Sequence, residues 1–263
     1  MSINADNLTK IYRLKKKQAK TAVDHVSFTI PDGEITGFIG PNGAGKSTTI
    51  KMMTGILIPD SGSVSIDGLS FKKNRKQIMM KTGVVFGQKS VLCWDIPVLD
   101  TLKLFRDMYR VPEAVYKENM ELFSEILGLD EFIGQPPRLL SLGQRMKADL
   151  AAALLYNPDI LFLDEPTIGI DVLSKERIRN FIERINRERH TTIILTTHDV
   201  SDIEKLCKRM IIIDKGSIIY DGTLGELKEN YGTTDLEEII KQIYLAGEQE
   251  AAESRADQLC RGA

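Results

Sequence analysis

Apolar and polar residues alternate in two short segments of the N-terminal part of the chain. In VSFTI, residues 26–30, and in SVSI, residues 63–66, every second residue is apolar. A period of two is typical of strands that have one buried face. We therefore predict an antiparallel β layer in the N-terminal part of the chain.

Three other segments are almost continuously apolar and contain β-branched residues: ITGFI at 35–39, ILFL at 160–163 and TIIL at 192–195. Such runs favour strands of a parallel sheet that is covered on both faces. Apolar residues at 178, 181, 182 and 185 predict a helix between the second and third runs. The order strand, helix, strand implies a right-handed parallel connection. A β-hairpin is expected in residues 210–223, with its turn at Asp214, Lys215 and Gly216.

The pattern before the second apolar run is helical. Residues 116–129 and 143–156 carry apolar residues at about every third or fourth position, which predicts helices of an inserted subdomain at about 89–158. The second helix has an apolar stripe, whereas its charged residues are expected to point elsewhere. The stripe consists of Met146, Leu150 and Leu154, and the charged residues are Arg145, Lys147 and Asp149.

The C-terminal part is predicted to end in helical structure and then a tail. Residues 225–245 are expected to be helical, with an apolar stripe on their last segment, and residues 246–263 are small and charged. A segment of that composition cannot bury enough apolar surface to fold. We therefore expect the tail to be flexible.

The composition is that of an ordinary globular chain. Of 263 residues, 42% are hydrophobic and 27% are charged, and 35 Lys and Arg against 37 Asp and Glu give a formal net charge of -2. Because no global positive field results, we expect no nucleic-acid partner. The three cysteines have no metal-ligand spacing, as expected in a reducing compartment. Without a membrane-spanning segment or signal peptide, the chain is expected to be cytosolic or peripheral to a membrane.

A glycine-rich loop follows the first apolar run and precedes a predicted helix. Its sequence, GPNGAGKST at 40–48, matches the phosphate-loop pattern. Backbone N–H groups of such a loop, with the helix N-terminus, bind phosphate oxygens. We expect Lys46 to reach the β- and γ-phosphates of ATP and Ser47 Oγ to coordinate Mg²⁺. The candidate nucleotide-binding residues of the loop are Gly40, Pro41, Asn42, Gly43, Ala44, Gly45, Lys46, Ser47 and Thr48.

Two adjacent carboxylates, Asp164 and Glu165, end the second apolar run. This places them at the carboxyl edge of the sheet, where α/β proteins bind ligands. We expect Asp164 to hold Mg²⁺, and Glu165 to polarise the water that attacks the γ-phosphate.

A further candidate anion site lies at LLSLGQ, residues 139–144, which contains Ser141, Gly143 and Gln144 just before a predicted helix. The phosphate loop, this segment, ILFLDE, the aspartate of IGID and the histidine of TTHD follow one another in an order that resembles the ATP-binding cassette (ABC) ATPase family. The signature motif of that family is commonly LSGGQ. The resemblance covers about residues 3–225. It implies an α/β phosphate-loop NTPase core with an antiparallel β layer and a helical insertion, in a nucleotide-binding domain at 1–245.

The resemblance implies roles for four isolated residues. Tyr12 would stack on adenine; the alternative is an aromatic residue on an edge strand without that role. Gln88 would bind Mg²⁺ and link the attacking water to the partner interface. Asp171 would communicate across a dimer, and His198 would contact the γ-phosphate.

In this family the signature serine and glycine cap ATP held by a second subunit, which implies that Ser141 and Gly143 complete a neighbour's site. Two positions depart from the family pattern. Leu142 stands where glycine is common, so a positive φ there would be strained. Gly87 precedes Gln88 where proline is frequent, which affects the stiffness of the loop.

The resemblance implies the ATP-hydrolysing subunit of an ABC transporter, which dimerises around two MgATP and drives a separate membrane permease, most similar to export systems. Such a subunit would bind peripherally to the cytoplasmic side of the membrane, in a dimer expected to be a homodimer, with a heterodimer as the alternative. The alternatives are a soluble ABC ATPase that acts on an assembly scaffold, ribosome or DNA, and a phosphate-loop kinase. The transported molecule is not determined by this sequence.

An apolar group follows Gln88: Val91, Leu92, Trp94 and Ile96. The resemblance implies a groove here for a short cytoplasmic helix of the permease, and an aromatic residue suits the centre of an interface. Alternatively, these side chains close the core of the helical subdomain.

Overall fold

The structure, a computed structural model, describes residues 1–13, 19–87 and 89–246. Its N-terminal sheet has the strand order β2-β1-β4-β5, and all its pairs are antiparallel. The strands are β1 (Ile3–Arg13), β2 (Ala19–Ile30), β4 (Ser61–Ile66) and β5 (Leu69–Ser70). The two alternating segments lie in β2 and β4, which confirms the antiparallel layer.

The second sheet has the order β10-β9-β3-β8-β7-β6, and only the β10–β9 pair is antiparallel. Its strands are β3 (Ile35–Ile39), β6 (Thr82–Phe86), β7 (Ile160–Asp164), β8 (Thr192–Thr196), β9 (Arg209–Asp214) and β10 (Ser217–Thr223). The three apolar runs form β3, β7 and β8 at the centre of this sheet, and the hairpin turns at Lys215 and Gly216, as predicted. Sequence reasoning did not identify the edge strand β6.

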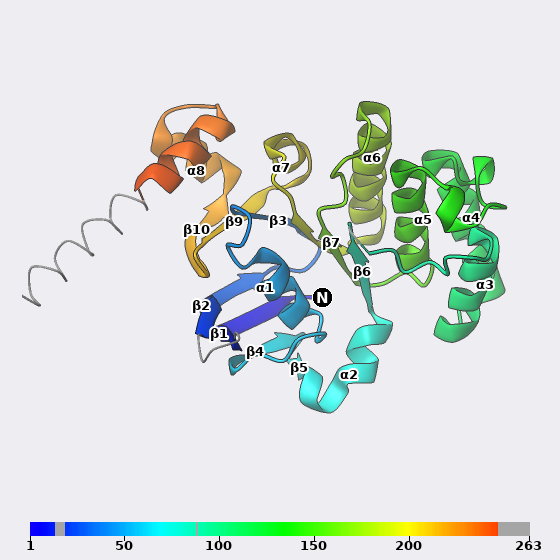
Figure 1. Ribbon diagram of the computed structural model, residues 1–263, viewed down its shortest axis with the longest axis horizontal. Coiled ribbons are helices and arrows are strands. Elements are labelled where there is room, and N and C mark those ends of the chain that lie inside the picture. The colour runs from blue at the N-terminus through cyan, green and yellow to red at the C-terminus, as the bar shows by residue number, and fades with distance from the viewer. Residues whose placement is uncertain (14–18, 88, 247–263) are drawn as a thin grey trace, which may run out of the picture.

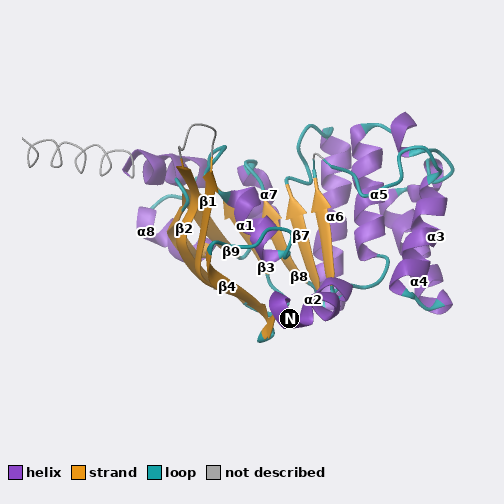
Figure 2. Cartoon of the chain, turned by 60° about the horizontal axis from the view of Figure 1, so that its bottom comes forward, coloured by secondary structure: helices purple, strands orange, loops and turns teal. Residues whose placement is uncertain are grey.

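Helices connect the strands and cover the larger sheet (Figures 1 and 2). Helix α1 (Lys46–Met53) follows β3, α2 (Phe71–Met80) precedes β6, α6 (Val172–Arg189) joins β7 to β8, and α7 (Val200–Leu206) joins β8 to β9. Between β6 and β7 the chain forms a helical subdomain, on the right of Figure 1. It consists of α3 (Val98–Tyr109), α4 (Glu113–Leu127), the 3₁₀ turns η2 (Leu129–Glu131) and η3 (Pro137–Leu139), and α5 (Leu142–Leu154).

The C-terminal helical segment is interrupted. Helix α8 (Leu224–Tyr231) ends at Gly232, which has φ of +63°, and a second helix occupies 236–246. The expected helical segment at 225–245 is therefore two helices, because glycine in the left-handed conformation terminates the first. Of the expected flexible tail, residues 247–263 lie outside the described residues.

Apolar side chains form two cores. One lies between the two sheets, where Phe28 of β2 contacts Phe38 of β3 edge to face at 5.2 Å between ring centroids. The other joins the parallel sheet to α6 and the helical subdomain.

Helix α5 belongs to this second core on more than one face. Its stripe of Met146, Leu150 and Leu154 is buried as predicted, but Lys147 and Asp149 are buried as well. The expected division into apolar and polar faces is wrong here because neighbouring elements cover both sides of the helix.

Candidate nucleotide-binding site

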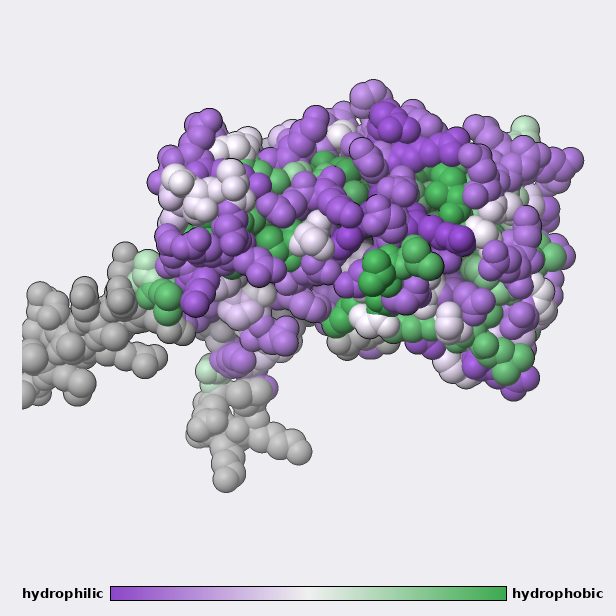
Figure 3. Space-filling model, turned by 90° about the horizontal axis from the view of Figure 1, so that it is seen from above, coloured by the Kyte–Doolittle hydropathy of each residue, from purple (hydrophilic) through white to green (hydrophobic). Residues whose placement is uncertain are grey.

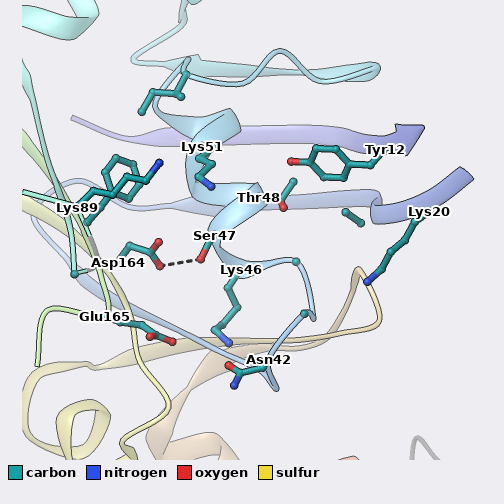
Figure 4. A pocket seen from close by; sticks show the side chains of 16 residues that line it. Tyr12, Lys20, Asn42, Lys46, Ser47, Thr48, Lys51, Lys89, Asp164 and Glu165 are labelled. Atoms are coloured by element: carbon teal, nitrogen blue, oxygen red, sulfur yellow. Dashed lines mark hydrogen bonds between the residues drawn. The ribbon is translucent and has the colours of Figure 1, made fainter. Parts of the chain in front are cut away.

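A pocket of about 600 Å³ opens where β3 and β7 end, between the phosphate loop and the N-terminal sheet (Figure 4). It is lined by residues from four parts of the chain. These are Tyr12, Lys20 and Ala22; Asn42, Gly43, Gly45, Lys46, Ser47, Thr48, Lys51 and Ile56; Phe86, Gly87 and Lys89; and Asp164 and Glu165.

The phosphate loop is held closed by its own lysine. Lys46 Nζ donates hydrogen bonds to the carbonyl oxygens of Gly40 at 2.5 Å and Pro41 at 3.2 Å. Burial lowers the pKa of Lys46, and the nearby carboxylates of Glu165 and Asp164 oppose that shift. Gly45 has φ of +112°, and a Cβ there would lie 2.5 Å from the carbonyl oxygen of Ala22. Only glycine fits this position, so the loop depends on it for its path.

The metal-binding candidates meet at the end of β7. Ser47 Oγ donates to Asp164 Oδ1 at 3.1 Å, and Thr196 Oγ1 donates to the same oxygen at 2.6 Å (Figure 4 shows the first bond). The side chains come from α1, β7 and β8, so the packing of the parallel sheet fixes their separation. Two oxygen ligands are thereby placed beside the phosphate loop.

Glu165 leaves the strand in an unusual conformation. Its φ is +55°, and its N–H donates to the carbonyl oxygen and to Oγ1 of Thr196, both at 3.0 Å. Such a backbone persists in a non-glycine residue only where its surroundings hold it. His198 Nδ1 lies 3.6 Å from Glu165 Oε1. The carboxylate, which lines the pocket, and the imidazole, which does not, are therefore neighbours.

The signature residues are ordered but lie outside the pocket lining. Ser141 Oγ accepts from the N–H of Gln144 at 3.2 Å, and the Gln144 side chain accepts from the N–H of Ser141 at 3.0 Å. This reciprocal capping box begins α5. Gly143 packs against α6, where an added Cβ would lie 3.2 Å from Ser174 Oγ. None of the three residues contributes to the pocket of its own chain.

The remaining sequence candidates have different environments. Asp171 caps α6 by accepting from the N–H of Ser174 at 2.9 Å, and this bond lowers its pKa. Tyr12 lines the pocket and is 39% exposed, so its ring is open to a ligand. Gln88 lies outside the described residues.

The two departures from the family pattern have clear structural outcomes. Leu142 begins α5 and is not among the residues with positive φ, so the strain that a positive φ would cause does not arise. At Gly87 a Cβ would lie 2.5 Å from the carbonyl oxygen of Glu165, and its N–H donates to the carbonyl oxygen of Asp164 at 2.8 Å. The proline ring would not fit in that space, and proline has no N–H group to donate, so this loop follows a path that suits glycine.

Sequence reasoning missed three pocket cations. Lys20, Lys51 and Lys89 line the pocket together with Lys46. Lys20 and Lys89 come from β2 and from the segment after β6, and only the folded chain brings them to the phosphate loop. No local motif marks them.

A parallel sheet with a phosphate loop between β3 and α1, and with two acids at the end of a neighbouring strand, defines a phosphate-loop NTPase. A family model described as "ABC transporter" matches residues 23–168. ABC transporter ATP-binding protein NatA of Bacillus subtilis is 33% identical over 245 residues, 93% of this chain and 99% of NatA. Linearmycin resistance ATP-binding protein LnrL of the same species is 33% identical and covers 95% of this chain and 76% of its own length.

Solved structures agree. A dimeric post-hydrolysis structure of the ATP-binding cassette MJ0796, bound to ADP and Pi, has a TM-score of 0.76 and 26% identity, and covers 84% of this chain and 98% of MJ0796. An ATP-binding subunit of an ABC transporter shares the fold, with a TM-score of 0.83. The chain belongs to the ABC transporter family as an ATP-binding subunit, and it is an ATPase.

Within the described residues, we find no helix with the length and apolar character needed to span a bilayer.

Proposed function

We propose that this chain hydrolyses MgATP at a site shared between two identical subunits, and that closure of the dimer drives export through a separate membrane permease. The observation that carries the proposal is the division of the site. Lys46, Ser47 and Asp164 surround one pocket, whereas the equally ordered Ser141–Gln144 segment lies outside it.

Mg²⁺ fits the oxygen pair at the end of β7. Magnesium takes oxygen ligands, and it is usually held by one or two protein groups together with substrate phosphates. Ser47 Oγ and Asp164 Oδ1 are 3.1 Å apart and would hold it, with the amide of Gln88 as a further candidate. When bound, the ion would neutralise charge that develops on the phosphates.

The protein groups around the γ-phosphate have complementary tasks. Lys46 would offset the negative charge of the β- and γ-phosphates, and its hydrogen bonds to the loop carbonyls hold it in place. Glu165 would polarise the attacking water, an effect typically worth about 10² to 10⁴ in rate. His198, beside Glu165, would contact the γ-phosphate.

The nucleotide would lie across both sheets. Tyr12 projects from β1 on the side of the pocket toward Thr48 in Figure 4, and would stack on adenine. Lys20, Lys51 and Lys89 add positive charge around the phosphates. A pocket of this kind suits a trianionic or tetra-anionic ligand with an aromatic end.

A second copy of the chain would supply the missing wall. Ser141, Gly143 and Gln144 of that copy would cap the γ-phosphate, using the N-terminus of α5. Asp171 would lie at the same interface, followed on α6 by Val172 and Leu173, which are 79% and 77% exposed. Apolar side chains exposed to this degree at the start of a helix support a contact surface.

The permease would bind beside the helical subdomain, on the cytoplasmic side of the membrane. In the segment after residue 88, Leu92 is buried, whereas Val91, Trp94 and Ile96 are 38%, 51% and 40% exposed. Figure 3 shows several apolar patches on one face of the molecule, some of them over the helical part on the right. Arg145 stacks on the face of Trp94, with its guanidinium carbon 5.6 Å from the ring centroid.

Export is favoured by the names of several relatives, such as the linearmycin resistance protein and the probable multidrug ABC transporter ATP-binding protein YbhF of Escherichia coli. YbhF is 38% identical over a region that covers 79% of this chain and 35% of YbhF. The methionine import protein MetN of Haemophilus influenzae, at 32% identity over 92% of this chain and 71% of its own length, is also similar. Purification from membranes tests the proposal. We expect the chain to co-purify with a multispan membrane protein that exports a compound. If the chain purifies only with ribosomes, DNA or a soluble scaffold, the alternative of a soluble ABC ATPase is supported.

A further inference from the structure

A buried ion pair contacts the two loops that carry Glu165 and His198. Asp202 of α7 is fully buried, and Arg179 of α6 is 8% exposed. Arg179 Nε donates to Asp202 Oδ1 at 2.6 Å, and Arg179 Nη2 lies 2.5 Å from the same oxygen. A pair removed from water in this way requires further hydrogen bonds to offset the loss of hydration.

The other oxygen of Asp202 receives those bonds, and both donors belong to the loops. Thr167 Oγ1 donates to Asp202 Oδ2 at 2.5 Å, and Thr197 Oγ1 donates to the same oxygen at 3.0 Å. Thr167 lies two residues after Glu165, and Thr197 directly precedes His198. Both threonines are at most 3% exposed. A single carboxylate oxygen therefore connects the loop after β7 to the loop after β8.

Further contacts tie the ion pair to the second loop. Thr197 Oγ1 accepts from the N–H of Asp199 at 2.9 Å, and Arg179 Nη2 donates to Ser201 Oγ at 2.7 Å. Lys175 Nζ donates to Asp199 Oδ2 at 2.9 Å. Burial acts to raise the pKa of Asp199, but its hydrogen bonds with Ser201 and Lys175 outweigh burial and lower it to about 2. The start of α7 is thus fixed to α6.

The loops also approach each other beside the pocket, where His198 lies 3.6 Å from Glu165, a residue that lines the pocket. We propose that Asp202, held by Arg179, is a positioning residue for hydrolysis that sets the separation of Glu165 and His198 through Thr167 and Thr197. None of these four residues lines the pocket, so they act through Glu165 and His198. The inference rests on the proposed roles of those two residues.

Valine substitutions at the two threonines test it. Thr167→Val and Thr197→Val keep the shape of the side chain and the Asp202–Arg179 pair, but remove one hydroxyl each. We expect kcat to fall about tenfold or more in each, because misplacement of a reacting group by about 1 Å is costly. The KM for ATP should change less than about twofold, because Lys46 and its loop are untouched. The double variant should be little slower than either single one, because both act through Asp202.

Two controls make the result specific. Thr167→Ser and Thr197→Ser retain the hydroxyl and should recover most of kcat. Thr82→Val removes another buried hydroxyl, which donates to the carbonyl oxygen of Ile78 at 2.8 Å. It should lower the melting temperature about as much as the loop variants do while leaving kcat unchanged.

Measurement of Glu165→Gln in the same assay distinguishes failure of the positioning inference from failure of the proposed role of Glu165. If Glu165→Gln is inactive but both valine variants keep wild-type kcat, the positioning inference is wrong. Serine variants as slow as the valine variants would also overturn it. If Glu165→Gln hydrolyses ATP at the wild-type rate, the proposed function of Glu165 itself fails.

Discussion

The phosphate loop and the signature segment are equally well ordered, yet only one of them belongs to the pocket. The loop at 40–48 is fixed by Lys46 and faces Asp164 and Glu165 of the same chain. The Ser141–Gln144 segment is fixed by a complete capping box, and lines no part of that pocket. The difference teaches that Lys46, Ser47, Asp164 and Glu165 of one chain share a pocket, whereas the N-terminus of α5 lies outside it and, in the proposed dimer, would cap ATP held by a second copy.

The largest effect is expected from a change in the phosphate loop. Lys46→Ala removes the buried ammonium that would offset the charge of the β- and γ-phosphates, so we expect the Kd for MgATP to rise about 100-fold or more. Isothermal titration calorimetry measures it. Lys241→Ala, at an exposed position on the C-terminal helix, should bind like the wild type. Equal affinity of Lys46→Ala and wild type would refute the assignment of this loop.

A change in the Ser141–Gln144 segment should affect catalysis rather than binding. Ser141→Ala is expected to bind MgATP normally but to lower kcat about tenfold or more, since a hydrogen-bond donor to the transferred phosphoryl group is lost. Thr223→Ala is the matched control, because Thr223 and Glu226 form the same capping box on α8. Loss of either cap should cost about 0.5 to 2 kcal/mol of stability. A similar kcat for the two variants would mean that Ser141 is only a helix cap.

Trp94 and Leu92 lie in the same segment, and truncating each residue tests whether it belongs to an interface or to the core. Trp94 is 51% exposed, so Trp94→Ala should leave the melting temperature and the basal ATPase rate almost unchanged while reducing co-purification with the permease. Leu92 is 6% exposed, and Leu92→Ala should cost about 2 to 5 kcal/mol of stability. Thermal unfolding of the isolated subunit distinguishes them. A large fall for Trp94→Ala would favour the interpretation of Trp94 as a core residue.

A fourth prediction concerns the attachment of the loop after β6 to α5, which should make stability depend on pH. Asp149 Oδ1 accepts from Ser90 Oγ at 2.8 Å and from the N–H of Val91 at 2.9 Å. Burial raises the pKa of Asp149 from 3.8 to about 6, although hydrogen bonds from Val91 and Ser90 oppose it. The folded state therefore binds this proton more tightly than the unfolded state does. The free energy of unfolding falls as pH rises from about 4 through about 6, by about 3 kcal/mol from this group.

Asp149→Asn should lack that fall. Denaturant unfolding at several pH values should show the wild type losing stability relative to the variant as pH rises through this window. A difference between the two proteins that does not change with pH would show that Asp149 has an ordinary pKa.

Much of this architecture follows from local sequence. The continuous apolar runs form β3, β7 and β8 because both faces of the central sheet are buried. The phosphate loop was recognisable because a fixed spacing of glycine, lysine and serine carries its chemistry. By contrast, α2 and the edge strand β6 were not identified, since TGVVF is short and β6 takes its place by pairing with the distant β7.

The same limit applies to the site. Lys20 and Lys89 join the pocket only through the tertiary fold. Asp149 and Lys147 were expected to point away from the core, but neighbouring elements cover α5 on both sides. Whether Leu142 takes a positive φ could not be predicted from the sequence; it does not, because α5 begins at that residue. The roles of the individual site residues, including those of Tyr12, Gln88, Asp171 and His198, stay predictions.

The most direct test of the shared site is the mass of Glu165→Gln in solution. This variant keeps Lys46, Ser47 and Asp164 but lacks the carboxylate that would polarise water, so bound ATP should persist. Multi-angle light scattering with saturating MgATP should give twice the mass of the 29.5 kDa chain, and adding Ser141→Ala to the same chain should weaken that dimer. A monomer at saturating MgATP, with ATP demonstrably bound, would contradict the shared site.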